Sequence, residues 1–460
     1  MIEGNDAKPD PAILKRTSTP HLGGIRFVMD HADIQDFRPV PFPALSIDPD
    51  LLGVAAAFRE RLFRDILPLW SVVGIDRTEG GFAEALSHRC RIEPGPRRVR
   101  VTARQVYAFA TAAEMGWNET AARACLDHGY RFLLRHCSAE GFLAHTLDHD
   151  GRVLDPGHDL YDQAFLVLAY AKAYRLTGDR RIALRAEELL RGLRCRFAAA
   201  NGGFVDHLAR RRPLRANPHM HLLEAALAWV EIDDTCEWRE FADDIVDLFL
   251  TRLFDRTSGF VLEDFDENWR AIRQDGRSRV EPGHQFEWAW LLMRWEQLSQ
   301  SSCAGVAERM IRFTESNGVD RTRRVAVNAL WQDGSIADAT ARLWPQTERL
   351  KAWLALAEAG HGEDAALAER HAADAAATVL SYLDTPVGGL WHDLMDEQGA
   401  FMPGPAPASS LYHIICAAQE LVAYCAGDGE PLGPARGTSM AGMRFRAPMA
   451  RPPAPVAAAR

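Results

Sequence analysis

Histidine and glutamate recur three positions apart in two apolar stretches of the chain. His221 precedes Glu224 in NPHMHLLEA, and His284 precedes Glu287 in EPGHQFEWAWLL. Residues i and i+3 share a helix face, so each carboxylate would orient its imidazole. An imidazole with a pKa near neutrality can take up and release a proton at pH 7. The spacing therefore predicts proton-transfer units on two helices.

Other candidate side chains lie at similar points of other apolar stretches. A single histidine on an apolar helix is usually a core residue, but three at equivalent points of a repeat favour a functional site. Trp344 is a candidate for stacking on a sugar ring. The remaining candidates are His413, Arg104, His158, Asp162 and Glu348.

Regularly spaced prolines and glycines predict the helices that position these residues. Six prolines are spaced 62 to 64 residues apart, and Gly-Phe or similar pairs fall midway between them. Proline is tolerated at the first helical position and glycine supplies turns, so each period reads as a pair of helices. Helix pairs are predicted from about Asp50 to Gly427, with the second partner of each pair in stretches such as 235–252 and 362–383. The prolines are Pro94, Pro156, Pro218, Pro282, Pro345 and Pro407. Pro94 fits least well, because Gly95 and Pro96 follow it, and its helix is expected to begin near Arg98.

Six such pairs predict an all-α fold, an (α/α)6 barrel. The proline-initiated helices are the more apolar and would form the inner ring. Their N-termini would gather at one end, which favours anions and brings the candidate side chains together. We expect the barrel at residues 46–427. Residues 1–45 and 428–460 are rich in proline and are predicted to be partly or fully disordered tails.

Composition excludes several classes of function. The 460 residues carry a net charge of −10, which argues against nucleic acid as a partner. No apolar run approaches a membrane span, and no secretory signal pattern is seen. Eight cysteines are scattered singly without a CxxC pair, which is typical of core thiols in a reducing cytoplasm. A homodimer is kept as an option.

The sequence lacks the motifs of several enzyme classes. There is no GxSxG, P-loop or GxGxxG motif, and His219-x-His221 has no third ligand at a metal-site spacing, so we expect no metal and no cofactor. Glycoside hydrolysis would need two acids, with Glu224, Glu287 and Glu348 as candidates. A helical scaffold for a partner protein is a further alternative. The basic run at 210–212, with Arg215 behind it, is either a solvated patch or a phosphate site.

Five stretches make the chain resemble the N-acylglucosamine 2-epimerase superfamily, which includes cellobiose 2-epimerases and mannose isomerases. They are VTARQVYAF (101–109), NPHMHLLEA (217–225), EPGHQFEWAWLL (281–292), WPQTERLKA (344–352) and SSLYHI (409–414). The resemblance implies an (α/α)6 barrel, as the repeat does. It also implies a small-molecule sugar substrate and neither a metal nor a redox cofactor.

The resemblance implies roles for single residues. Arg104 matches an arginine that contacts the sugar oxygens, and His221 matches a substrate-binding histidine. His284 and His413 match the acid/base pair, with Glu287 beside the former. One departure is Gln285, where several members carry a second histidine; this change could alter hydrogen bonding to the sugar.

The implied reaction starts from the open-chain aldehyde of a sugar. An imidazole removes the proton from C2 to form an enediolate. Return of the proton to C1 gives a ketose, and return to the other face of C2 gives the epimer. We favour the aldose–ketose isomerase, mannose to fructose or a close relative. The alternatives are a 2-epimerase of the N-acylglucosamine or cellobiose type and an isomerase of mannose 6-phosphate.

Overall fold

The computed structural model describes residues 50–209, 213–232 and 236–427. Both predicted tails, the basic run at 210–212 and the predicted helix start at residue 235 lie outside these ranges.

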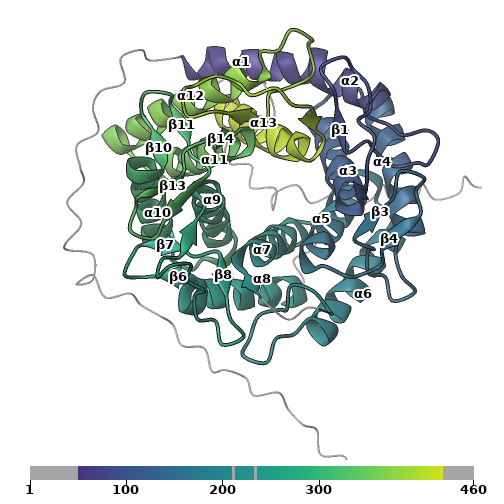
Figure 1. Ribbon diagram of the computed structural model, residues 1–460, viewed down its shortest axis with the longest axis horizontal. Helices are drawn as coiled ribbons and strands as arrows, with labels where there is room; N and C mark the ends of the chain where they lie inside the picture. Colours follow the sequence, from purple (N-terminus) through teal and green to yellow (C-terminus); the bar gives the residue numbers. More distant parts are fainter. Residues whose placement is uncertain (1–49, 210–212, 233–235, 428–460) are drawn as a thin grey trace, which may run out of the picture. The chain divides into compact units, whose positions relative to one another are not determined.

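An inner ring of helices surrounds the barrel axis. Each inner helix packs against the next one along the chain, and α13 packs against α3, so the ring closes (Figure 1). The inner helices are α3 (Val99–Glu114), α5 (Leu160–Thr177), α7 (Ala216–Val230), α9 (Pro282–Ser299), α11 (Leu343–Ala359) and α13 (Ser409–Ala426).

An outer ring covers the inner one. Helices α4, α6, α8, α10 and α12 each pack against the inner helix that precedes them, and α1 packs against α12 and α13. The predicted (α/α)6 barrel is confirmed. The outer helices are α1 (Leu51–Arg61), continued by η2 (Leu62–Ile66) and α2 (Leu67–Val72), then α4 (Glu119–Arg135), α6 (Arg180–Arg196), α8 (Cys236–Leu248) with η3 (Phe249–Leu253), α10 (Ala304–Gly318) and α12 (Gly362–Leu383).

The periodic prolines mark most inner-helix starts to within two residues. Helix α9 begins at Pro282, α7 and α11 begin two residues before their prolines, and α13 begins two residues after Pro407. The prediction is wrong for Pro156, because α5 begins at Leu160. There Asp159 caps the helix by accepting a hydrogen bond from the amide of Tyr161. The cap, and not the proline, sets this start.

The fourth residue of five inner helices clamps the return loop before it. In α5, Gln163 Oε1 accepts from the amide of Leu143 at 2.8 Å. Gln285 does the same to Val261, and its Nε2 donates to the Val261 carbonyl. The same position is Thr102 in α3, His219 in α7 and Gln346 in α11, bound to the amides of Phe82, Phe204 and Ala326. Gln285 is therefore a buried structural residue, which corrects the expectation that it alters sugar binding.

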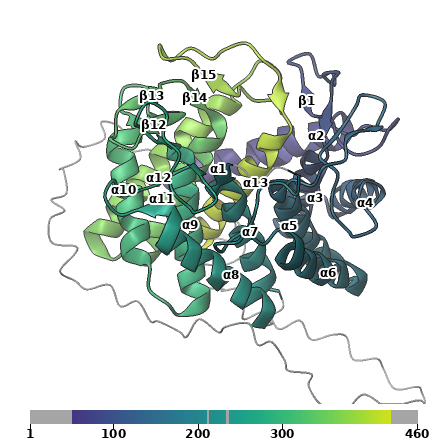
Figure 2. The same cartoon turned by 60° about the horizontal axis from the view of Figure 1, so that its bottom comes forward.

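Short strands join the return loops into a circle at one end of the barrel. Figure 2 shows several of them, including β1 and β12–β15, gathered at that end. Several of the strand pairs link one repeat to the next, and β16 returns to β1. The second and third repeats are joined by a bridge between Asp159 and His207. The linking pairs are β2 (Arg97–Arg98) with β3 (Thr146–Leu147), β5 (Leu214–Arg215) with β8 (Asp264–Phe265), β9 (Arg279–Val280) with β12 (Ala329–Trp331), β14 (Ala341–Arg342) with β15 (Leu394–Met395), and β16 (Ala406–Pro407) with β1 (Ala85–Leu86).

The remaining strands lie within single return loops. Strand β4 (Val153–Asp155) pairs with β3, and β13 (Ile336–Asp338) with β12. Strand β6 (Phe254–Asp255) pairs with β7 (Phe260–Val261), and β10 (Val319–Asp320) with β11 (Val325–Ala326).

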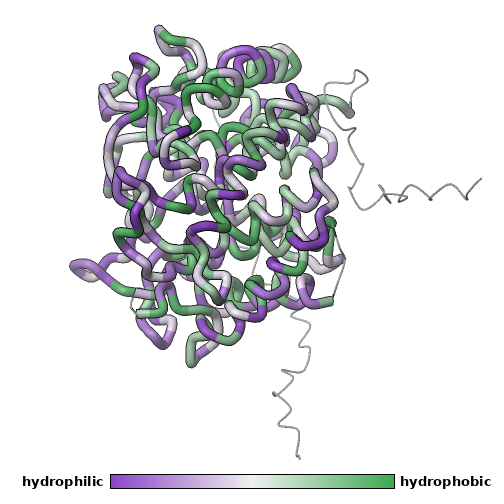
Figure 3. The backbone as a smooth tube through the Cα atoms, turned by 90° about the vertical axis from the view of Figure 1, so that its right-hand side faces the viewer, coloured by the Kyte–Doolittle hydropathy of each residue, from purple (hydrophilic) through white to green (hydrophobic). Residues whose placement is uncertain are grey.

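The apolar core lies within and between the two rings. Hydrophobic stretches run along the stacked helices in Figure 3, whereas many projecting loops are hydrophilic. The eight cysteines, all in described residues, are free; Cys195 and Cys236 are exposed, so their prediction as core thiols is wrong. No helix in the described ranges has both the length and the apolar character to cross a bilayer.

Candidate active site

The sequence-predicted residues of the inner helices converge at the end of the barrel where those helices begin. Arg104, His221, Glu287, Glu348 and His413 all lie within the first six residues of α3, α7, α9, α11 and α13. Because the inner helices run the same way around a closed ring, their first turns face one another. The site therefore combines helix N-termini with a ring of imidazoles and carboxylates.

His413 is oriented by a carboxylate from the neighbouring helix. Its Nδ1 lies 2.8 Å from Oε1 of Glu348, which is fully buried on α11. Burial, Arg104 and Lys351 hold the pKa of His413 well below its usual value. The lowered pKa favours a neutral imidazole at His413. If Glu348 is ionised, Nδ1 of His413 carries the proton and Nε2 is left as a base for a substrate.

His284 has a different partner from the one predicted. Its Nδ1 lies 2.9 Å from Oε2 of Glu263 and 3.6 Å from Oε2 of Glu281. The expectation that Glu287 orients His284 is wrong. Glu263 comes from the return loop between β7 and β8, which is held on α7 by the hydrogen bond from the Ala216 amide to the Glu263 carbonyl.

The carboxylates around His284 make it cationic. Burial disfavours its protonated form, but Glu263 and Glu281 outweigh burial and raise the pKa of His284 to about 10. The two predicted acid/base histidines thus differ in charge at neutral pH. A protonated His284 can act as a general acid, while His413 can act as a general base.

One indole ring lies against both histidines. The ring centroid of Trp344 is 5.1 Å from that of His284 and 5.6 Å from that of His413. Trp344 is half-buried, and the two histidines keep 6% and 5% of their surface exposed, so they are not sealed from solvent. A Cβ on Gly283 would come within 2.4 Å of the Trp344 ring, which explains the glycine at that close approach.

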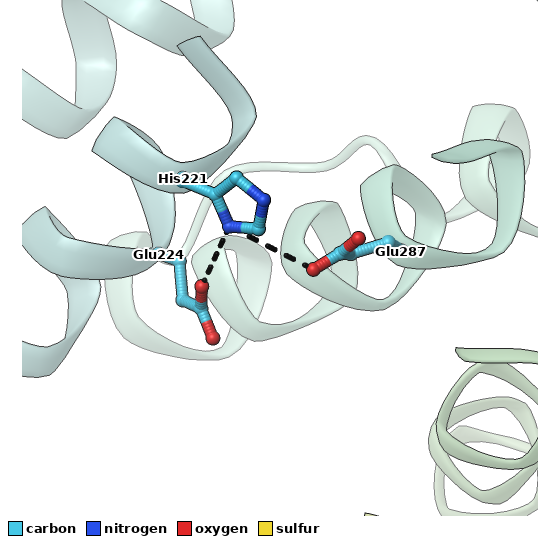
Figure 4. A group of neighbouring side chains, drawn as sticks. All are labelled: His221, Glu224 and Glu287. Atoms are coloured by element: carbon cyan, nitrogen blue, oxygen red, sulfur yellow. Dashed lines mark hydrogen bonds and ion pairs between the residues drawn. The ribbon is translucent and has the colours of Figure 1, made fainter. Parts of the chain in front are cut away.

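His221 forms a second polar group with two carboxylates (Figure 4). Its Nδ1 lies 3.1 Å from Oε2 of Glu224, as the i,i+3 spacing predicts, and 3.8 Å from Oε1 of Glu287. The other oxygen of Glu224 accepts from the hydroxyl of Tyr412. Burial lowers the pKa of His221 to about 4, so it is neutral.

Glu287 has no hydrogen-bond partner for either carboxyl oxygen in the described part of the chain, although it is 1% exposed. Burial and the neighbouring carboxylates Glu348 and Glu224 raise its pKa well above the usual value. We therefore assign Glu287 the protonated form at neutral pH. Glu224 is ionised, because His221, Lys351 and Tyr412 outweigh its burial and lower its pKa. A buried, unsatisfied carboxyl group is suited to bind a substrate hydroxyl.

Arg104 brings positive charge to the same end of the barrel. Its guanidinium donates to the carbonyl of Ser409 and to the hydroxyl of Tyr161, and lies 4.1 Å from the ring centroid of Phe165. The Nε atom of Arg104 is buried and unpartnered among the described residues. The side chain can therefore still donate to a substrate oxygen.

The two predicted residues of α5 and the loop before it are engaged elsewhere. His158 Nδ1 lies 3.1 Å from the carbonyl of Leu143. Asp162 is fully buried and binds Arg100 at 2.7 Å and His145 at 2.6 Å. These contacts assign both residues to the framework beside the site.

Within the described ranges, two groups of residues have ligand atoms close enough to hold a metal ion. They are His221, Glu224 and Glu287, and Glu287, Glu348 and His413, with all atoms of each group within 4.8 Å. The ammonium of Lys351 already supplies a positive charge 2.6 Å from Glu348. His219 belongs to neither group; burial lowers its pKa to about 4, and it clamps Phe204.

The sequence reasoning missed several contributors to the site. Glu263 has no helical spacing to His284, and Tyr161 and Tyr412 stand in apolar stretches that carry no signal of a polar role. Lys351 stands three residues after Glu348, a spacing that could have indicated the pair.

Comparison with known proteins agrees with this arrangement. Residues 80–417 match the family described as N-acylglucosamine 2-epimerase (GlcNAc 2-epimerase). The chain belongs to this family. It is therefore related to enzymes that isomerise or epimerise carbohydrates, and the resemblance seen in the sequence is confirmed.

Individual members of the N-acylglucosamine 2-epimerase family cover most of the barrel. A mannose-6-phosphate isomerase of Rhizobium meliloti (strain 1021) is 40% identical over 363 residues, which are 77% of this chain and 93% of the relative. A D-mannose isomerase of Thermobifida fusca is 28% identical over 62% of this chain and 74% of the relative. The structure of cellobiose 2-epimerase from Bacillus thermoamylovorans B4167 has a TM-score of 0.71, with 20% identity, and covers 80% of this chain and 98% of that one.

Proposed function

We propose that this enzyme is an aldose–ketose isomerase that interconverts mannose, or mannose 6-phosphate, with the corresponding fructose. The observation that carries the chemistry is the pair of histidines against Trp344. One is neutral through burial and the other cationic through Glu263 and Glu281. The isomerase outcome and the mannose substrate are supported by the names of the two isomerase relatives.

The proposed reaction moves one proton between adjacent carbons. His413 Nε2 takes the proton from C2 of the open-chain aldose, and the electron pair of that bond forms the C1–C2 double bond of an enediolate. Arg104 stabilises the negative charge as it develops on the carbonyl oxygen at C1, and His284 then donates a proton to that oxygen, which gives the neutral enediol. The neutral His284 then takes the hydroxyl proton from O2. His413, whose proton has exchanged with solvent, protonates C1, which completes the ketose and restores both side chains.

Sugar recognition is assigned to the groups beside the histidines. Glu287, protonated and unpartnered, can donate to one sugar hydroxyl, and ionised Glu224 can accept from another. The half-buried indole of Trp344 offers an apolar surface for a sugar face. The free cysteines support a reducing compartment such as the cytoplasm. The homodimer, the absence of nucleic acid partners and the limits of the tails stay predictions from the sequence.

The experiment that tests this function is a product-resolved sugar panel in deuterated water. Mannose, mannose 6-phosphate, N-acetylglucosamine and cellobiose are incubated with the enzyme, and the products are analysed by NMR. We expect fructose or fructose 6-phosphate with deuterium at C1. Deuterium at C2 of an epimeric aldose as the sole product would replace the isomerase with the 2-epimerase, and no turnover of any of the four sugars would contradict the proposal.

A further inference from the structure

A lysine is completely buried beneath the candidate site. Lys351 lies on α11 and has no exposed surface. Its Nζ lies 2.6 Å from Oε2 of Glu348, 3.7 Å from Sγ of Cys416 on α13 and 3.7 Å from the ring centroid of Trp290 on α9. Burying an unpaired ammonium costs several kcal/mol. These partners offset that cost and keep the charge at one point.

One carboxylate connects this ammonium to the proposed base. Glu348 uses Oε2 for Lys351 and Oε1 for the ring nitrogen Nδ1 of His413, at 2.8 Å. The hydroxyl of Thr347 is 3.3 Å from the same Oε1. An ionised carboxylate only accepts hydrogen bonds, so it requires the proton on Nδ1 of His413. A protonated Glu348 could donate to Nδ1 and would favour the tautomer without a free lone pair on Nε2.

We propose that Lys351 is a positioning residue for the proton transfer: its buried ammonium keeps Glu348 ionised, and Glu348 thereby fixes the tautomer of His413 that exposes a basic Nε2. This role rests on the proposed function of His413 as the base. Lys351 thus adds to the site a residue that lies three positions after Glu348 on α11 and does not itself reach the surface.

The charges around Lys351 are consistent with a fixed cation. Burial disfavours its charged form, but Cys416 and the three glutamates at 224, 287 and 348 outweigh burial and raise its pKa above the usual value. It therefore stays protonated over the working range of an imidazole. Burial outweighs the opposing groups and leaves the pKa of Glu348 above its usual value, and Lys351 is the main group that limits this rise.

The other charged groups facing Glu348 and His413 come from the remaining inner helices. Arg104 on α3 and His221 on α7 lie near His413, and both disfavour its protonated form. Glu224 on α7 favours the protonated form of His413. An ionised Glu287 on α9 would repel the negative charge of Glu348. Protonation of Glu287 removes this repulsion. Of these groups, Lys351 is the one that directly contacts the Glu348 carboxylate.

The test compares K351M with K351R in the full-length protein. Methionine keeps the volume and removes the charge, whereas arginine keeps the charge. The first readout is the ¹⁵N spectrum of the histidine rings without sugar, with the His413 signals assigned by their loss in H413Q. The second is the pH dependence of kcat for the sugar that the wild-type enzyme converts.

We expect the wild type and K351R to show His413 with the proton on Nδ1 at pH 7. In K351M, His413 should change to the other tautomer or to imidazolium, and the acidic limb of kcat should move up by about one pH unit or more. An unchanged tautomer in K351M, with kcat lowered by the same factor at every pH, would show a merely structural lysine and overturn the proposal.

A second variant is used if K351M does not fold. If circular dichroism shows K351M unfolded, K351Q replaces it, because glutamine can still donate to Glu348 without carrying a charge, and the same outcomes apply. The spectrum needs no turnover. A wild type that converts none of the sugars would therefore contradict the proposed function, and the tautomer of His413 would still decide the role of Lys351.

Discussion

The Oε2 atom of Glu263 lies 2.9 Å from Nδ1 of His284, although the two residues are 21 positions apart. Glu263 stands in a return loop that the pairing of β5 with β8 fixes over the start of α7. His284 stands in the first turn of α9, the next inner helix. This contact makes His284 cationic at neutral pH, and so distinguishes it from His413.

Replacing Glu263 by glutamine should convert His284 from an acid to a mostly neutral ring at pH 8. Its folded pKa is about 10 and its ordinary value 6.5, so the basic limb of kcat/KM should fall from near pH 10 toward neutrality. We expect kcat/KM at pH 8 to fall by about ten-fold or more. The measurement is the pH profile of kcat/KM between pH 6 and 10.

E281Q is the matched control for E263Q. Glu281 is 3.6 Å from the same nitrogen, beyond hydrogen-bonding distance, and its side chain is 25% exposed. Its removal should move the basic limb less than E263Q does. An unmoved limb in E263Q would show that His284 does not act as the acid.

The sequence predicted the ring of helices and the location of the site, because both follow from local patterns. Prolines and glycines repeat with the period of one helix pair, and residues near each helix start must then meet at one end. The i,i+3 rule was right for His221 and Glu224. It failed for His284 because a return loop, which has no helical spacing to α9, brings Glu263 closer.

Equivalent positions of a repeat also have a structural role that the sequence pattern did not reveal. The metal alternative for His219 beside His221 is set aside in the sequence analysis, and Gln285 is expected there to affect hydrogen bonding to the sugar. Both occupy the fourth position of their helices and bind the backbone amide of the preceding loop. Gln163 has the same role. A comparison of the repeats at this single position would have revealed the clamp.

A methyl group at Gly283 should disturb catalysis through Trp344. An alanine Cβ would lie 2.4 Å from Cζ3 and 2.5 Å from Cη2 of that ring, so the indole must move away from its place beside the two histidines. We expect G283A to lower kcat/KM by about 10- to 100-fold, because displacements of about 1 Å in an active site have effects of this size. Steady-state kinetics with the established sugar measures it.

G305A serves as the control, since Gly305 lies in α10 with open space around its Cβ position. It should keep full activity, and its stability should match or slightly exceed that of the wild type. Wild-type kcat/KM in a folded G283A would mean that the position of Trp344 does not matter to the reaction.

A buried ion-pair network between α10, α11 and α12 should carry much of the stability of the fifth repeat. Arg349 on α11 binds Glu315 on α10 through two hydrogen bonds, at 2.8 Å and 2.5 Å, and Asp374 on α12 at 2.9 Å. Removing one partner leaves an incompletely paired buried charge. We expect E315Q to lower the free energy of unfolding by about 3 kcal/mol at pH 7, measured by urea denaturation.

The stability lost in E315Q should be largest above pH 4.5 and smaller at lower pH. Burial raises the pKa of Glu315, but Arg349 and His371 outweigh it, so the folded pKa lies below the ordinary 4.5. The stabilisation is thus complete above pH 4.5 and is lost as the pH falls toward the folded pKa. The difference in the free energy of unfolding between the wild type and E315Q should decrease by about 1.4 kcal/mol per pH unit below 4.5.

The control for E315Q is E60Q, which removes an exposed pair with Arg64. Both side chains of this pair are more than half exposed, at 61% and 74%. E60Q should change the free energy of unfolding by less than about 1 kcal/mol. Equal losses in E60Q and E315Q would contradict the role assigned to the buried network.

The two glutamates beside His221 should respond differently to the same substitution. Glu287 is assigned as protonated, so the amide of E287Q resembles its native state in charge and in its ability to donate. Glu224 is ionised and accepts from both Tyr412 and His221. An amide at position 224 removes that charge and leaves one of the two donors poorly matched.

We therefore expect E224Q to lower kcat/KM by about 100-fold or more and E287Q by less than about ten-fold at pH 7. E287D is the informative companion, because it keeps the acid and withdraws it by one methylene; a larger loss in E287D than in E287Q would show that position and not charge matters at 287. If E287Q instead lost as much activity as E224Q, Glu287 would have to act as a carboxylate. The unpartnered oxygens of Glu287 would then be acceptors for the sugar and not donors to it.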